Sequence, residues 1–294
     1  MRFSLRQIEV FLAIAHFENV SRAAEQLSLS QSAASGALKE LESQYDIQLF
    51  DRIGKRLKLN EHGKQLRVKA ESLITLAQDI EEDLKRNRVI GNLKVGATLT
   101  IGNYLCVDVI EQYLKDAPDA HINLNIANTE RIKKELLNFD IDVGLLEGEI
   151  QHADLDIQSW KKDELICFCA PEHPLANRKN LCIDDLFQAI WILRELGSGT
   201  RQTFDRATSK HQGQLNVALE LEQTEAIKRA VGKGLGISCL SSIALEEDFA
   251  RGIFVPLHCS ALDLSRSLYI AVHKHKFRSA SLKRWLELCG MSSS

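Results

Sequence analysis

The chain has 294 residues, 45% of them hydrophobic and 26% charged, a composition typical of a globular protein that buries a large core without disulfide bonds. Its 37 Lys and Arg residues against 40 Asp and Glu residues give a net charge of -3, which excludes a uniformly basic coat for nucleic acid but allows a local basic patch. No stretch offers the roughly 20 apolar residues of a membrane span, so we expect a cytoplasmic protein without a membrane partner.

Residues 5–27 predict two short helices. Apolar residues recur at helix spacing from Leu5 to Ala15, and this pattern ends at residues 18–20. Ser21 is then a candidate N-cap for a second helix over residues 22–27, in which small alanines allow another helix to approach closely.

A third helix is predicted to begin after its N-cap Ser30 and to run to about residue 43. Apolar residues Ala34, Leu38 and Leu41 form its inner face, which leaves outward the polar residues Gln31, Ser32, Ser35 and Lys39. Two helices with a tight connection form a helix-turn-helix, whose second helix can lie in the major groove of DNA. The alternative is a small helical packing unit with a solvated loop.

The segment after these helices is basic although the whole chain is slightly acidic. Between residues 52 and 69 the single acid is Glu61, and the basic residues are Arg52, Lys55, Arg56, Lys58, Lys64, Arg67 and Lys69. Such a patch indicates an anionic polymer as partner, and we expect residues 52–58 to form a hairpin wing against phosphates.

Five motifs of this region resemble one protein family. They are Phe11-Leu12-Ala13, Ser21-Arg22-Ala23-Ala24-Glu25-Gln26-Leu27, Leu29-Ser30-Gln31-Ser32-Ala33-Ala34-Ser35, Leu38-Lys39-Glu40-Leu41-Glu42 and Leu49-Phe50-Asp51-Arg52. They resemble the winged helix-turn-helix of LysR-type transcriptional regulators. The resemblance implies double-stranded DNA and RNA polymerase as partners. It also implies a DNA-binding set of Ser21, Arg22, Ser30, Gln31, Ser32, Ser35, Lys39, Arg52, Lys55 and Arg56, in which residues 31, 32, 35 and 39 face the groove and the last three contact the backbone.

A long helix is predicted from Glu61 to about residue 88, with Asn60 as its N-cap. Its apolar residues follow a heptad seam of Leu66, Ala70, Leu73, Ala77, Ile80 and Leu84. The seam predicts a coiled coil with a second copy, which suits a reader of two half-sites, and the family resemblance implies a homotetramer. The alternative is a single amphipathic helix that lies on its own domain.

Strands and helices alternate beyond Gly91. The order strand, helix, strand, helix, strand over residues 93–146 predicts a parallel sheet with helices on both faces, and a similar order starts again at residue 163. We expect an α/β protein with a winged helix-turn-helix domain over 1–60, a linker and dimerisation helix over 61–91, and a two-lobed effector domain over 92–294. This last domain resembles the family's effector domain, similar in fold to periplasmic binding proteins, with lobes at about 92–162 plus 268–294 and at 163–267.

Three loops at the carboxyl ends of predicted strands combine hydroxyl groups with the N-terminus of a helix, where ligands of α/β proteins bind. They hold Thr98 with Thr100, the run Gly197-Ser198-Gly199-Thr200-Arg201, and Thr224. In the second loop, glycines free backbone N–H groups to turn inward, the hydroxyls can donate, and Arg201 adds a forked charge. These groups predict a site for a small oxyanion; the alternative is an ordinary strand-to-helix turn.

Motifs along nearly the whole chain resemble the YeiE branch of the LysR family, which is linked to sulfite sensing and sulfur metabolism. They include Thr100-Ile101-Gly102-Asn103-Tyr104, Trp191-Ile192-Leu193-Arg194-Glu195 and Gly234-Leu235-Gly236-Ile237-Ser238. Sulfite is therefore the expected effector. We expect Glu147 and Glu195 to border the same cleft, where an unpaired acceptor favours an anion that carries a proton. The alternatives are an organic carboxylate effector and cysteine oxidation.

Cysteine usage and motif searches exclude other classes of protein. The seven cysteines are scattered, form no Cys-x-x-Cys pair and are too few for a disulfide scaffold; they are Cys106, Cys167, Cys169, Cys182, Cys239, Cys259 and Cys289. Apolar neighbours favour buried, reduced thiols for most of them. No nucleophile elbow, Walker loop, zinc spacing or dinucleotide fingerprint occurs, so we expect no enzyme activity, no metal and no cofactor.

Overall fold

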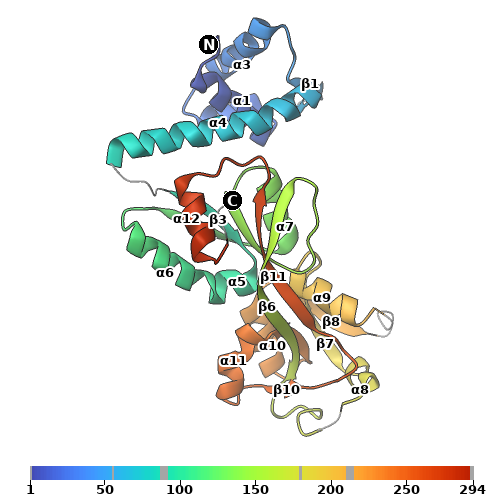
Figure 1. Ribbon diagram of the computed structural model, residues 1–294. Coiled ribbons are helices and arrows are strands. Elements are labelled where there is room, and N and C mark those ends of the chain that lie inside the picture. The colour runs from blue at the N-terminus through green and yellow to red at the C-terminus, as the bar shows by residue number, and fades with distance from the viewer. Residues whose placement is uncertain (1, 55, 87–91, 179–180, 210–214, 292–294) are drawn as a thin grey trace. The chain divides into compact units, whose positions relative to one another are not determined.

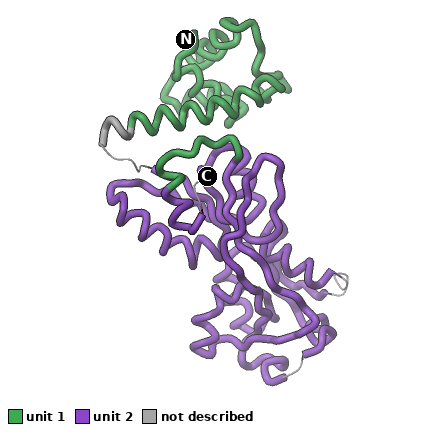
Figure 2. Tube along the Cα trace, in the orientation of Figure 1, with its two compact units in different colours: residues 1–91, 274–283 green, residues 92–273, 284–294 purple. Residues whose placement is uncertain are grey.

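The computed structural model describes residues 2–54, 56–86, 92–178, 181–209 and 215–291. Two units, residues 1–91 with 274–283 and residues 92–273 with 284–294, divide the chain (Figure 2). Lys55 and the predicted end of the linker at residues 87–91 lie outside the described residues. Across the part of the chain that is described, no helix is both long and apolar enough to cross a lipid bilayer.

The N-terminal unit begins with the helices α1 (Leu5–Phe17), α2 (Val20–Gln26) and α3 (Gln31–Tyr45) (Figure 1). Ser30 caps α3 as predicted, because its Oγ accepts the N–H of Ala33 at 3.2 Å. The prediction that Ser21 caps α2 is wrong. Asn19 precedes the helix, and its Oδ1 accepts the N–H groups of Ser21 and Arg22 at 2.9 and 3.1 Å.

The wing is an antiparallel hairpin of β1 (Phe50–Ile53) and β2 (Arg56–Leu59), in which Phe50 pairs with Leu59. Phe50 turns into the core of the unit, where its ring lies 5.6 Å from that of Phe11. The Leu57 N–H donates to the carbonyl of Glu18 at 3.0 Å, which attaches the second strand of the hairpin to the end of α1.

The helix α4 (Glu61–Arg86) starts where the sequence predicts, since Asn60 Oδ1 accepts the Gly63 N–H at 2.9 Å. The first part of its apolar seam serves this unit itself: Ala70 is buried in the core, and Leu66 and Leu73 pack against that core. The expectation that the entire seam faces a second copy is therefore wrong for these positions. Ile80, further along, is 51% exposed, and the side chain of Leu84 lies outside the described residues.

The second unit begins with a parallel sheet, as predicted, and its first strand β3 lies between β4 and β5. We call it, with its helices, the first lobe; its elements are β3 (Leu93–Ala97), α5 (Leu99–Tyr104), α6 (Cys106–Asp116), β4 (Ile122–Ile126), α7 (Thr129–Leu137) and β5 (Val143–Glu147). Sequence alone predicts one helix over residues 101–115, but the structure has two helices, α5 and α6. Leu105 has φ -120° and ψ -30°, which breaks the regular helical backbone between α5 and α6.

Two strands cross from the first lobe to the second (Figure 1). They are β6 (Leu155–Cys169) and β11 (Ser265–His273), which pair antiparallel with Arg266 opposite Asp163. β11 also pairs with β5 in the first lobe, while the far end of β6 pairs with β9 and β10 in the second. Sequence alone predicts strands at 165–170 and 268–272, which leaves out the charged first part of β6 and the first three residues of β11.

The second lobe contains the parallel pair β7 and β8, with helices packed against its strands. Its elements are α8 (Ile183–Phe187), β7 (Ile190–Arg194), α9 (Gly199–Ala207), β8 (Asn216–Leu221), α10 (Thr224–Gly232), β9 (Ser238–Ser241), α11 (Ser242–Ala250) and β10 (Val255–Leu257). Trp191 is fully buried, and its indole N–H donates to the Leu186 carbonyl at 2.8 Å. The last helix of the chain is α12 (Ala280–Leu288).

Candidate functional site

The first candidate site is the polar face of α3. The apolar residues Ala34, Leu38 and Leu41 are buried, so the helix presents its other side to solvent. The described residues of the predicted DNA-binding set are all exposed, namely Ser21, Arg22, Ser30, Gln31, Ser32, Ser35, Lys39, Arg52 and Arg56. A Cβ added to Gly36 on this helix would meet no atom within 4 Å. The polar face is therefore open to a large partner.

The second candidate site is centred on the carboxylate of Glu147, at the end of β5. Glu147 is 1% exposed and accepts three hydrogen bonds: from Thr98 Oγ1 at 2.8 Å, the Thr100 N–H at 2.8 Å and Thr200 Oγ1 at 3.2 Å. The first two donors belong to the first lobe and the third to α9 of the second. The structure thus brings together three of the residues that sequence predicted for an oxyanion, around an anion that the protein itself supplies.

The positive charge at this cluster comes from Arg266 on β11. Its Nη1 lies 2.8 Å from Glu147 Oε2 and donates to Thr200 Oγ1 at 3.0 Å, and its Nε lies 2.7 Å from Asp163 Oδ2. Asp163 in turn accepts the hydroxyl of Ser241 at 2.8 Å. Neither Arg266 nor Asp163 is predicted as a site residue from the sequence. The alternation of side chains along a strand could have indicated that Arg266 is buried. It lies on the same side of β11 as the buried residues Leu268, Ile270 and Val272.

Glu147 stays charged despite its burial. Burial alone raises the pKa of this carboxyl group, but the Arg266 charge and the hydrogen bonds from Thr98 and Thr100 outweigh it and hold the pKa below its ordinary value. Glu147, Asp163 and Arg266 together carry one net negative charge. The hydroxyl and N–H donors around them compensate for the water that this charge has lost.

The Gly-Ser-Gly-Thr-Arg run begins α9 and joins the two lobes. Ser198 caps the helix. The Gly199 N–H donates to Thr129 Oγ1 at 3.1 Å, and the Thr129 hydroxyl in turn donates to the backbone carbonyl of Glu147 at 3.0 Å. A Cβ on Gly199 would collide with that same carbonyl oxygen. Gly199 is therefore needed for close approach between the lobes, whereas Gly197 has φ +89°, a left-handed backbone that glycine adopts readily.

Arg201 and Glu195 have other partners than sequence predicted. Arg201 Nε donates to Asp205 at 2.9 Å, and its Nη1 donates to Glu220 at 2.9 Å. Glu195 is held by two hydrogen bonds from Arg194, at 2.8 and 2.9 Å. Thr224 is buried at the start of α10. Among the described residues, none of the hydrogen bonds or ion pairs to the Glu147 carboxylate comes from Arg201, Glu195 or Thr224.

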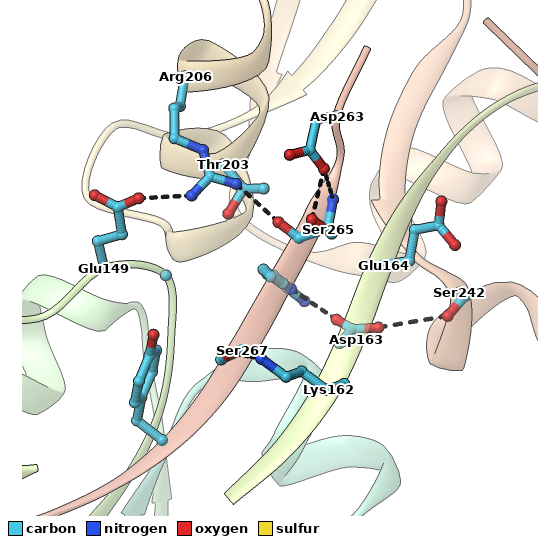
Figure 3. A pocket seen from close by; sticks show the side chains of 13 residues that line it. Glu149, Lys162, Asp163, Glu164, Thr203, Arg206, Ser242, Asp263, Ser265 and Ser267 are labelled. Atoms are coloured by element: carbon cyan, nitrogen blue, oxygen red, sulfur yellow. Dashed lines mark hydrogen bonds and ion pairs between the residues drawn. The ribbon is translucent and has the colours of Figure 1, made fainter. Parts of the chain in front are cut away.

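Two cavities lie near this cluster. The α9 cavity, of about 330 Å³, is lined by residues of both lobes: Thr129, Glu130, Lys133, Glu149, Ile150, Leu196, Gly197, Ser198, Arg201, Gln202 and Asp205. The β6–β11 cavity, of about 830 Å³, lies against the two crossing strands (Figure 3). Its lining is Gly148, Glu149, Lys162, Asp163, Glu164, Thr203, Arg206, Ser242, Asp263, Ser265, Arg266, Ser267 and Tyr269.

Most cysteines in the second unit are buried and held as thiols. Burial raises the pKa of Cys106 and Cys289 to about 12 and that of Cys169 to about 11, and the pKa of Cys239 is also raised. Cys182 is exposed and donates to Asp185 at 3.1 Å. Within the described residues, no group of three His, Cys, Asp or Glu side chains is placed to hold a metal ion.

An exposed helix-turn-helix face and a two-lobed α/β unit with a buried polar cluster define a DNA-binding regulator with an effector domain. Comparison with known proteins agrees: residues 5–64 match the "bacterial regulatory helix-turn-helix protein, lysR family" and residues 86–292 the "LysR substrate binding domain". The chain belongs to the LysR family of transcriptional regulators and is not an enzyme.

Relatives match this chain over all or most of its length. The chain is 39% identical over 289 residues to the uncharacterized HTH-type transcriptional regulator YeiE of Escherichia coli K12, covering 98% of each. A full-length OxyR variant from Pseudomonas aeruginosa has the same fold, with a TM-score of 0.72 and 22% identity, over 100% of this chain and 96% of that one. The regulatory domain of Synechocystis CcmR in complex with 2-PG has a TM-score of 0.63 and 28% identity, over 68% and 95%.

Proposed function

We propose that this regulator responds to sulfite, bound at the Glu147 cluster between the two lobes. The observation that carries the proposal is the meeting of donors from three separate elements, β3–α5, α9 and β11, on the buried carboxylate of Glu147, so that an oxyanion bound beside Glu147 would share these donors with it. Hydroxyl, N–H and guanidinium donors are the groups that recognise a small oxyanion. The resemblance to the YeiE branch supplies the choice of sulfite.

Glu147 gives the site a reason to prefer sulfite over sulfate. The charged groups of the cluster already carry one net negative charge, so a doubly charged anion is repelled more strongly than a singly charged one in this buried setting. A sulfite ion that carries a proton has one charge and one donor, and the ionised Glu147 can accept its hydrogen bond. Sulfate at neutral pH has no such proton, so it meets the carboxylate without an attractive contact.

Calorimetry on the full-length protein tests this site. Thr200→Val removes a hydroxyl of the cluster and is expected to weaken sulfite binding about tenfold. Thr208→Val is the matched control, because Thr208 is equally buried at the other end of α9 and donates only within that helix. Sulfite that binds equally tightly to both variants, or gives no heat with the wild type, contradicts the proposal.

An organic anion is the second candidate effector, and the α9 cavity favours it. At about 330 Å³, this cavity is larger than sulfite requires and is lined by Ser198, Arg201 and Gln202. CcmR, in its complex with 2-PG, shows that a related domain takes such a ligand. The same titration with 2-PG in place of sulfite decides between the two. Control by cysteine oxidation has less support, because the raised pKa values keep most thiols neutral.

The second half of α4 exposes apolar side chains that bear on how the protein assembles. Leu76 and Ile80, on the second half of α4, are 39% and 51% exposed, which is unusual for large apolar side chains spaced four residues apart on one helix. We infer that this exposed half pairs with the same helix of a second copy. Further association of such dimers into a homotetramer, and contact with RNA polymerase at the promoter, are implied by the family resemblance.

A further inference from the structure

The β6–β11 cavity has polar walls from both lobes and a floor formed by the crossing strands (Figure 3). The strand register sets Ser265 opposite Glu164, Arg266 opposite Asp163 and Ser267 opposite Lys162. Side chains alternate along a strand, so residues 162, 164, 265 and 267 share one face. Asp163 and Arg266 lie in the opposite phase, where they are buried and reach the Glu147 cluster.

Most charges around the cavity neutralise one another. Arg266 pairs with Asp163 at 2.7 Å, and Arg206 pairs with Glu149 at 2.6 Å. Arg206 also donates to the Ser265 carbonyl at 2.8 Å, so both contacts of this guanidinium are with residues that line the cavity. The charged residues of the cavity outside these two ion pairs are one cation, Lys162, and two carboxylates, Glu164 and Asp263.

The three remaining charges have capacity for a ligand. Among the described residues, the Glu164 carboxylate makes no ion pair or hydrogen bond. Asp263 accepts the N–H and hydroxyl of Ser265, which lower the pKa of its carboxyl group and keep it ionised. Lys162 Nζ donates to Ser267 Oγ at 3.0 Å and has two further N–H donors.

We propose that the β6–β11 cavity is a second ligand site, for a small zwitterion of the α-amino-acid class. Its ammonium group would lie between Glu164 and Asp263, and its carboxylate would accept from Lys162 and the hydroxyl of Ser267. Positions 162 and 164 are about 7 Å apart along β6, so both flexible side chains can reach one small molecule. Tyr269 and Thr203 also line the cavity, beside the space for the ligand's side chain.

This site is separate from the proposed sulfite site but shares one element with it. Arg266 touches the β6–β11 cavity and also contacts Glu147, Thr200 and, at 3.4 Å, Thr100. The cavity wall further joins the lobes through the Arg206 to Glu149 ion pair. A ligand here would therefore act on the same contacts that hold the lobes together, as a second signal beside the anion.

A screen of the full-length protein tests the proposal. The proteinogenic L-amino acids are titrated by calorimetry at millimolar concentration, and the tightest binder is then compared with its methyl ester and its N-acetyl form. Each derivative removes one charge, so each is expected to bind about tenfold more weakly or worse. Absence of binding by every amino acid, or binding of both derivatives as tightly as the parent amino acid, overturns the proposal.

Variants locate the binding. Glu164→Gln and Lys162→Met are both expected to weaken the amino acid about tenfold or more, while Glu172→Gln and Lys233→Met, which change exposed residues outside the cavity, leave it unchanged. Sulfite is titrated in parallel, and its affinity should be the same in all four variants. If Glu164→Gln binds the amino acid as tightly as the wild type, the proposed amino-acid site is wrong. If the wild type binds the amino acid but not sulfite, only the proposed effector is wrong.

Discussion

Glu147, Asp163 and Arg266 place three charges in the interior, each less than a tenth exposed. Removing a charge from water costs several kcal/mol, and an ion pair offsets that cost only with good geometry and further hydrogen bonds. The threonine hydroxyls and the Ser241 hydroxyl provide those bonds here. The cluster therefore joins the lobes, and removal of one charged partner leaves another charge buried without its counter-charge.

Replacement of Arg266, the cation of the cluster, should cost more stability than replacement of an arginine in a partly exposed ion pair. Arg266→Met leaves two buried carboxylates without a counter-charge, so we expect a loss of about 3–5 kcal/mol in the free energy of unfolding. Arg201→Met is the matched control, since Arg201 pairs with Asp205 and Glu220, which are 29% and 46% exposed; its loss should be about 1 kcal/mol. Denaturant unfolding measures both. Equal losses would show that Arg266 does not hold the cluster together.

The elements of the chain differ in how well sequence predicted them. Helix α3 and strands β3 and β5 were predicted because their caps or apolar periods are strong. The charged first part of β6 and the start of β11 with Arg266 were missed, since a buried charge is stable only beside its partner. Arg266 and Asp163 are 103 positions apart, and no local pattern indicates such a pair. The partners of Arg201 were missed for the same reason, because Asp205 and Glu220 pair with it only in the folded lobe.

Gly199 at the start of α9 should tolerate no side chain. Gly199→Ala places a Cβ against the Glu147 carbonyl, so the lobes must separate and both thermal stability and sulfite binding should fall. Gly36→Ala is the control, because that helical position is open, and alanine there should stabilise by about 0.5–1 kcal/mol. Thermal unfolding of the two variants measures the contrast. A Gly199→Ala variant as stable as the wild type would mean that the lobes do not meet there.

The two halves of α4 should respond differently to a charge. Ile80→Asp changes an exposed residue, so the N-terminal unit should stay folded while dimers dissociate at micromolar concentration. Ala70→Asp should instead unfold the N-terminal unit, because Ala70 is buried in its core. Sedimentation velocity and circular dichroism separate the two effects. An Ile80→Asp protein that sediments like the wild type would exclude this helix as the dimer contact.

The whole molecule combines a DNA-binding domain with a domain that binds small effectors. Base edges specify a sequence and phosphates position the protein, so the two kinds of DNA contact should separate on mutation. Gln31→Ala or Ser35→Ala should reduce discrimination between operator and random DNA. Arg56→Ala should weaken both equally and lower the salt dependence of binding. Fluorescence anisotropy on the two DNAs at several salt concentrations checks this, and unchanged preference in all three variants would remove α3 from the interface.

The most direct test of the account is the preference of the full-length protein for sulfite over sulfate, measured by calorimetry with the wild type and with Glu147→Gln. We predict that the wild type binds sulfite and largely rejects sulfate. Because Glu147→Gln removes an acceptor and a repulsive charge together, the ratio of the two affinities should fall more than the sulfite affinity itself. A variant that keeps the wild-type ratio, or a wild type that binds neither anion, would contradict the assignment of the Glu147 cluster as the sulfite site.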